Sequence, residues 1–112
     1  MTAKLEIEQQ EKNGWAVLSP AGEIDLASVE LLETRLADLA RNSIDRVLID
    51  LTGVTFLDST GLRTLLSAHT RLAEEGGTLA LVVSGGPVER LLDITGVGST
   101  LTIHPSLEAA TA

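Results

Sequence analysis

Two nearly continuous apolar runs, at residues 46–51 and 78–83, constrain the fold of this 112-residue chain more than any other feature. A strand with one face in water alternates apolar and polar residues, whereas a strand that is apolar throughout its middle is buried on both faces. Strands of that kind are typical of parallel sheets, because the crossover connections place helices on the sheet. The two runs therefore predict interior strands of an α/β sheet.

Three segments around these runs have helical periodicity instead. The first extends from Ser28, a candidate N-cap, to about Arg41, and the third lies between Pro87 and a stop at Gly96. The second begins near Ser59 and ends at the two glycines 76–77. Its expected inward stripe consists of Leu62, Leu65, Leu66, His69, Leu72 and Ala73. Helices that alternate with strands favour right-handed crossovers and a mainly parallel sheet.

The N-terminal part has the pattern of an antiparallel hairpin. Apolar residues alternate with glutamates at 5–8, Asn13-Gly14 is a turn signal, and an apolar run resumes at 15–18. Pro20 and Gly22 are then expected to interrupt the second strand of the hairpin.

The chain is expected to form one domain over residues 1–112, because its length leaves no room for two. A short strand at 101–103 and one or two helical turns at 106–112 complete the predicted order of elements. The predicted fold class is α/β, with a mixed, mainly parallel central sheet, an antiparallel hairpin at its N-terminal edge and helices packed on it. Trp15 and Phe56 are the only aromatic residues, and both are expected in an otherwise aliphatic core.

The net charge of −8 and a pI near 4.5 exclude several classes of partner. So acidic a surface repels phosphate backbones and anionic lipid heads, so no direct nucleic-acid or membrane partner is expected. The chain has no cysteine, which excludes disulfides, thiolate chemistry and cysteine-based metal sites. Residues 1–10 lack the apolar core of a secretory signal, so the cytoplasm is the expected compartment.

The most unusual segment joins the first apolar run to the second helix and ends in Asp58-Ser59-Thr60-Gly61. Asp58 is placed to cap the helix, with Ser59 and Thr60 in its first turn. Gly61 costs about 0.5–1 kcal/mol against alanine inside a helix, which suggests close approach of a backbone or a partner. The segment is either a plain capped helix or a phosphate acceptor, because free amides and the helix dipole favour an anion there.

Three motifs, in this order, carry a family resemblance. They are Gly-Glu-Ile-Asp at 22–25, Phe-Leu-Asp-Ser-Thr-Gly-Leu at 56–62, and Pro-Val-Glu-Arg-Leu-Leu-Asp-Ile-Thr-Gly at 87–96. Together they resemble the STAS-domain anti-sigma-factor antagonists of bacteria, over essentially the whole chain. The resemblance implies the STAS fold and a partner switch that regulates transcription.

In such a switch, the unphosphorylated antagonist binds an anti-sigma factor that is also a serine kinase of the GHKL ATPase type, and the sigma factor is freed. By the same resemblance the kinase phosphorylates Ser59, the modified antagonist dissociates, and a metal-dependent PP2C-type phosphatase resets the switch. The implied partner-binding residues are Gly22, Asp25, Asp58, Ser59, Thr60, Gly61, Arg63 and Ser67, with the outward side of the second helix extending to Arg71.

Arg63 departs from the family pattern, in which small residues are often found after the motif. It places a cation one helical turn from the expected phosphorylation site. It could pair with the phosphate, select the partner, or be an ordinary solvated helix residue.

Enzyme alternatives fit the sequence less well. Aspartic proteases need Asp two residues before Gly, and here Asp58 precedes Gly61 by three. A serine hydrolase needs the Gly-x-Ser-x-Gly elbow, which Ser59 lacks, and His69 and His104 have structural explanations. No catalytic residue, metal ion or cofactor is therefore expected. The alternative within the same fold is an unphosphorylated STAS scaffold or accessory subunit of a stress-sensing or lipid-transport complex.

Overall fold

The computed structural model describes residues 4–112, so residues 1–3 of the domain expected over residues 1–112 lie outside it. The elements are β1 (Leu5–Lys12), β2 (Trp15–Ile24), α1 (Val29–Arg41), β3 (Arg46–Asp50), β4 (Gly53–Leu57), α2 (Ser59–Glu74), β5 (Thr78–Val82), α3 (Gly86–Thr95), a 3₁₀ turn (Val97–Ser99), β6 (Thr102–His104) and α4 (Leu107–Thr111). The sheet has the order β1-β2-β3-β5-β6, with β4 also paired to β2. Only β1 and β2 are antiparallel, so the predicted mixed α/β class is confirmed.

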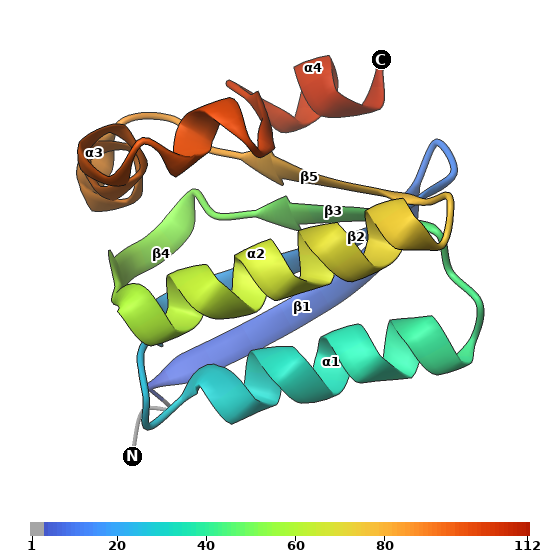
Figure 1. Ribbon diagram of the computed structural model, residues 1–112, viewed down its shortest axis with the longest axis horizontal. Helices are drawn as coiled ribbons and strands as arrows, with labels where there is room; N and C mark the ends of the chain where they lie inside the picture. The colour runs from blue at the N-terminus through green and yellow to red at the C-terminus, as the bar shows by residue number, and fades with distance from the viewer. Residues whose placement is uncertain (1–3) are drawn as a thin grey trace.

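The two faces of the sheet carry different layers. Helices α1 and α2 lie side by side over one face, and α4 lies on the opposite side (Figure 1). Because side chains alternate along a strand, Ile49 packs under α1 and α2 while its neighbour Leu48 packs toward α4. The predicted burial of both faces is therefore confirmed for β3 and β5. No helix in residues 4–112 is long and apolar enough to cross a bilayer.

Strand β4 is absent from the sequence prediction, which had residues 53–57 as an irregular link. The Asp50 carboxylate accepts hydrogen bonds from the amide and hydroxyl of Thr52 (3.1 and 2.7 Å), and this turn ends β3. The chain then pairs with β2 a second time, further along, from Gly53 onward. A five-residue strand that starts at glycine has too short a pattern to be recognised by periodicity.

The prediction that Pro20 and Gly22 interrupt the second strand is wrong. Strand β2 continues to Ile24, pairing with β3 over 16–18 and with β4 over 21–24. Pro20 lies between these two partners, where the missing N–H leaves no gap in either ladder. Gly22 has φ +118°, and a Cβ there would clash with the carbonyl oxygen of Lys4. Glycine thus allows β1 to pass close to β2 at the point where the register between β2 and β4 shifts.

The expected helix boundaries hold more closely than the expected helix faces. Helices α2 and α3 stop at Gly76 and Gly96, both with positive φ, as predicted. On α2, however, Ala73 is exposed, whereas Ala68 is buried against the sheet. The expected stripe is therefore correct at Leu62, Leu65 and Leu72 but wrong at its C-terminal end.

The two aromatic residues behave differently. Trp15 is buried, with the guanidinium of Arg46 stacked 4.4 Å from its ring centroid. Phe56 is 46% exposed on β4, so its expected place in the core is wrong. Its motif neighbour Leu57 faces inward instead.

Candidate functional site

The first turn of α2 presents an exposed hydroxyl beside free backbone amides. Asp58 is in an extended conformation, and its carboxylate accepts a hydrogen bond from the amide of Gly61 (3.0 Å), which confirms the predicted cap. The Ser59 side chain is exposed. Within residues 4–112, the amides of Ser59 and Thr60 donate to no acceptor. Such unpaired amides at a helix start attract negative charge.

Gly61 lies beneath this turn and not on its surface. A Cβ at this position would lie 2.7 Å from Cγ2 of Ile24 and would overlap a methyl group of Leu57. The glycine therefore lets the first turn of α2 lie against β2 and β4. The close approach anticipated from the sequence is made by the chain's own strands.

The loop after β2 adjoins the start of α2. The amide of Asp58 donates to the carbonyl oxygen of Ile24 (3.2 Å), the residue before Asp25. One oxygen of Asp25 accepts from the amides of Ala27 (3.0 Å) and Ser28 (3.1 Å), and the other pairs with Lys4 at 2.5 Å. Ser28 occupies the N-cap position of α1 as predicted, but its side chain makes no cap hydrogen bond, and the Asp25 carboxylate instead holds the turn that enters the helix.

Lys4 adds a cation that the sequence analysis missed. Its hydrogen bond with Asp25 raises the pKa of the ammonium group, and the carboxylates of Glu23 and Asp58 act in the same direction. The same hydrogen bond lowers the pKa of Asp25. The Asn13-Gly14 turn could have indicated this position of Lys4. A two-residue turn there sets the register of the hairpin, and this register places Lys4 opposite Glu23.

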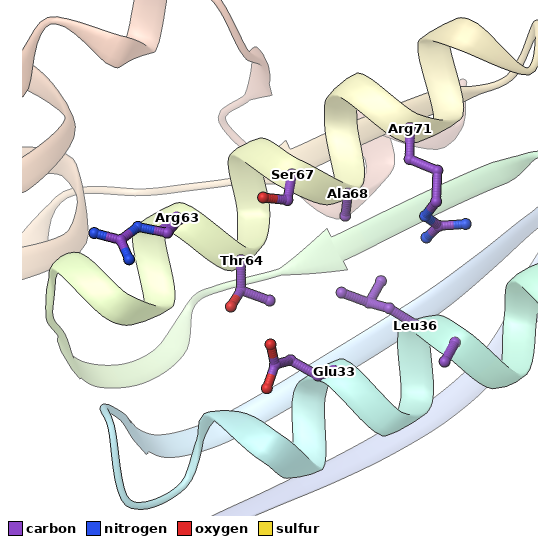
Figure 2. Close-up of a pocket in the computed structure, with 8 residues that line it drawn as sticks. Glu33, Leu36, Arg63, Thr64, Ser67, Ala68 and Arg71 are labelled. Atoms are coloured by element: carbon purple, nitrogen blue, oxygen red, sulfur yellow. The ribbon is translucent and has the colours of Figure 1, made fainter.

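A groove of about 320 Å³ runs between α1 and α2. Figure 2 shows Glu33 and Leu36 of α1 facing α2 across it. The α2 side is formed by Arg63, Thr64, Ser67, Ala68 and Arg71. The sequence analysis anticipated the α2 side of this groove but not the α1 side, since no pattern indicated that the two helices pack next to each other.

Two exposed apolar side chains lie in the segments that contain Asp25 and Asp58. Leu26, which is 78% exposed, follows Asp25, and Phe56, which is 46% exposed, comes two residues before Asp58. Exposed apolar groups that gather beside polar ones are typical of binding surfaces. The sequence analysis named neither residue as part of a binding face.

Apart from Asp25, which lies in the loop between β2 and α1, the predicted site residues fall into two groups. Asp58, Ser59 and Thr60 share one turn, with Arg63 and Ser67 following on the same helix. Gly22 and Gly61 adjust the packing of the strands and helix beneath them. Within residues 4–112, no three metal-ligating side chains cluster together.

A mixed sheet with an antiparallel first pair of strands and two helices packed on one face is the α/β fold of a STAS domain. The chain belongs to the STAS domain family, whose model matches residues 5–110. Among its relatives is the anti-sigma-B factor antagonist of Bacillus subtilis (strain 168), 32% identical over 108 residues, which are 96% of each chain. The crystal structure of an anti-sigma factor antagonist from Mycobacterium paratuberculosis superposes with a TM-score of 0.87 at 29% identity, covering 95% of this chain and 90% of that one.

Two further solved structures show the likeness of fold alone. One is the anti-sigma factor antagonist SpoIIAA in its unphosphorylated form, with a TM-score of 0.76 and 18% identity. The other is the Bacillus cell fate determinant SpoIIAA in the phosphorylated form, with a TM-score of 0.71 and 17% identity. They cover 94% of this chain in both cases, and 93% and 96% of their own chains.

Proposed function

We propose that this protein is an anti-sigma-factor antagonist whose binding is switched by phosphorylation of Ser59. The unphosphorylated form binds an anti-sigma factor, which thereby releases its sigma factor to RNA polymerase. The named relatives support the antagonist function. In this role the chain is a cytoplasmic binding protein and not an enzyme.

The exposed hydroxyl of Ser59 is the observation that carries the proposal. It occupies the first position of α2, where two free amides and the helix dipole can accommodate a dianion without disturbing the core. The solved forms of SpoIIAA support the same point at the level of the fold, since one fold accommodates both states. Thr60, the neighbouring hydroxyl, is only half-exposed.

The partner is an anti-sigma factor with serine-kinase activity of the GHKL ATPase type. It transfers the γ-phosphoryl group of ATP to Ser59: the bond from Oγ to phosphorus forms, the bond to ADP breaks, and the hydroxyl proton leaves. A PP2C-type phosphatase then hydrolyses the phosphoserine and restores the binding form. Only the antagonist's hydroxyl is needed from this chain, so the proposal requires no catalytic group here.

The phosphate acts on binding through its charge. It adds about −1.5 to −2 charges beside Asp58, on a chain whose net charge is already −8. A contact that buries a neutral hydroxyl cannot bury an uncompensated dianion without a cost of several kcal/mol, and each 1.4 kcal/mol is a factor of ten in affinity.

The proposed binding face combines polar and apolar groups. It contains the first turn of α2, the adjoining loop with Asp25 and Leu26, Phe56 of β4, and the outward side of α2 with Arg63 and Ser67. The two exposed apolar side chains supply burial, and Ser59 begins the helix whose later residues line the α2 side of the groove. Addition of charge at Ser59 therefore changes the charge of this proposed face.

Mass spectrometry of phosphopeptides from the protein in its native cells, growing and stressed, provides the first test. We expect phosphate on Ser59 whose occupancy changes with condition. Ser59 that stays unmodified in every condition, with phosphatases inhibited, contradicts the switch and favours a scaffold role.

Titration calorimetry with the purified kinase provides the second test. Ser59→Ala should bind like the wild type, and Ser59→Asp should bind at least tenfold more weakly. Thr60→Ala is the matched control, because it removes the adjacent hydroxyl and should remain switchable by ATP. If Ser59→Ala and Ser59→Asp both bind like the wild type, Ser59 is not the switch.

A further inference from the structure

Arg63 lies one helical turn C-terminal to Ser59, the proposed phosphorylation site, on the same helix. Residues four apart occupy the same face of a helix, and helical side chains point back toward the N-terminus. Figure 2 shows the guanidinium of Arg63 extended toward the N-terminal end of α2, whereas that of Arg71 is directed toward α1. The first turn that Arg63 approaches contains Ser59.

The positive charge of Arg63 is not paired with a carboxylate of residues 4–112 in the unmodified protein. Within residues 4–112, its guanidinium forms no ion pair, whereas Arg71 lies 3.6 Å from a carboxylate oxygen of Glu75 and Lys4 is bound to Asp25. No acidic residue occurs between 59 and 73, although the chain carries sixteen in all. An exposed cation without a counter-ion, in so acidic a protein, is available for a new anion on its own helix.

We infer that Arg63 binds the phosphate of phosphorylated Ser59 within the same chain. This deepens the proposed function, on which it rests. The phosphate is held from two sides, by the free amides of Ser59 and Thr60 and by the guanidinium of Arg63. Arginine suits this role because its planar fork offers paired donors to phosphate oxygens.

The pairing also changes the groove between α1 and α2. Arg63 lines that groove in the unmodified protein, where it is the cation nearest to Ser59 in sequence. Once it binds the phosphate, its charge is neutralised and its donors are occupied. Phosphorylation thus adds negative charge at the helix start and also withdraws a positive group from the surface beside it.

The other charged groups around Arg63 come from α1, from the start of α2 and from the adjoining loop. Glu33 of α1 lines the same groove and faces α2, but within residues 4–112 it forms no ion pair with Arg63. Asp58 caps the helix and opposes the dianion, and Asp25 and Glu23 share the field of Lys4. Lys4 is the competing cation, but it is already hydrogen-bonded to Asp25. Transfer of Lys4 to the phosphate would leave that carboxylate without its partner, which favours Arg63.

The second pKa of the phosphoserine, followed by ³¹P NMR, tests the inference. Phosphoserine is incorporated at position 59 during synthesis, so that no kinase is needed. A bound guanidinium favours the dianion and lowers this pKa. We expect Arg63→Gln to raise the pKa by about 0.3 unit, consistent with an i,i+4 pair, and the effect to shrink in 1 M NaCl.

Arg71→Gln is the matched control, because it removes the same charge two turns further along the helix, and it should leave the pKa within 0.1 unit or so of the parent value. Equal shifts in Arg63→Gln and Arg71→Gln, no shift in Arg63→Gln, or a shift only in Lys4→Gln each overturn the inference. Amide NMR spectra of the variants verify that each is folded. If Ser59 proves unphosphorylated in cells, the proposed function fails, while the NMR result still decides where Arg63 binds.

Discussion

Replacement of Gly61 by alanine tests how the proposed phosphorylation site is supported. In an ordinary helix interior this change stabilises a protein, by about 0.5–1 kcal/mol, because alanine has the higher helix propensity. Here the added methyl group would lie 2.7 Å from Cγ2 of Ile24 and 3.3 Å from its carbonyl oxygen, and would overlap Leu57. We therefore expect the opposite sign.

The magnitude follows from the balance of the two effects. Ile24 is fully buried and Leu57 is 7% exposed, so neither side chain can move into solvent. Overpacking of such a site costs about 1–3 kcal/mol. After subtraction of the propensity gain, Gly61→Ala should destabilise the protein by about 1 kcal/mol, which lowers Tm by about 5 °C for a domain of this size.

Urea denaturation monitored by circular dichroism measures this effect. Thr70→Ala, at an exposed position of α2, is the control that reports the propensity gain without the overlap. Leu57→Ala should relieve part of the crowding, so that Gly61→Ala costs less in that background. A Gly61→Ala variant as stable as the wild type would show that the first turn of α2 is not packed as described.

Three further predictions concern the cap, an ion pair and the second face of the sheet. Asp58→Ala should cost about 1 kcal/mol of unfolding free energy, and Asp58→Asn only a few tenths, because asparagine also caps; urea titration distinguishes them. The pKa of Asp25 is lowered in the folded protein, so the ionised carboxylate stabilises the fold at every pH above the ordinary aspartate pKa. This stabilisation is lost as the pH falls through the pKa of Asp25 in the folded protein. The stability difference between the wild type and Asp25→Asn should therefore be largest at pH 5–7 and shrink below about pH 4. Ala110→Asp places a carboxylate in the buried apolar cluster between α4 and the sheet and should cost about 2 kcal/mol or more, measured in the same way.

The sequence predicts those parts of the fold whose signals are long or redundant. The apolar runs that become β3 and β5 are buried on both faces, and the glycines at 76 and 96 end their helices as expected. The cap by Asp58 is also predictable, because a short acidic side chain before a periodic segment has few other uses. In each case local chemistry and the global fold favour the same structure.

Other features depend on contacts between distant segments. Strand β4 exists because β2 has a free stretch of edge beyond β3, and nothing in residues 53–57 reveals that edge. Phe56 is exposed for the same reason, since its orientation follows from pairing with Glu23 after a register shift between β2 and β4 in which Thr55 has no partner. The Lys4–Asp25 pair becomes visible only once the hairpin register is fixed.

The packing at the start of α2 bears on how a switch at Ser59 can work. Gly61 fits against Ile24 and Leu57, and Asp58 is bonded both to the amide of Gly61 and to the carbonyl group of Ile24. A turn held at so many points cannot shift by much without loss of these contacts, because close-packed interiors do not deform continuously. A phosphate on Ser59 therefore changes the charge of the surface and leaves its shape nearly unaltered. The response of a partner should accordingly depend on salt concentration, as a charge effect does and a change of shape does not.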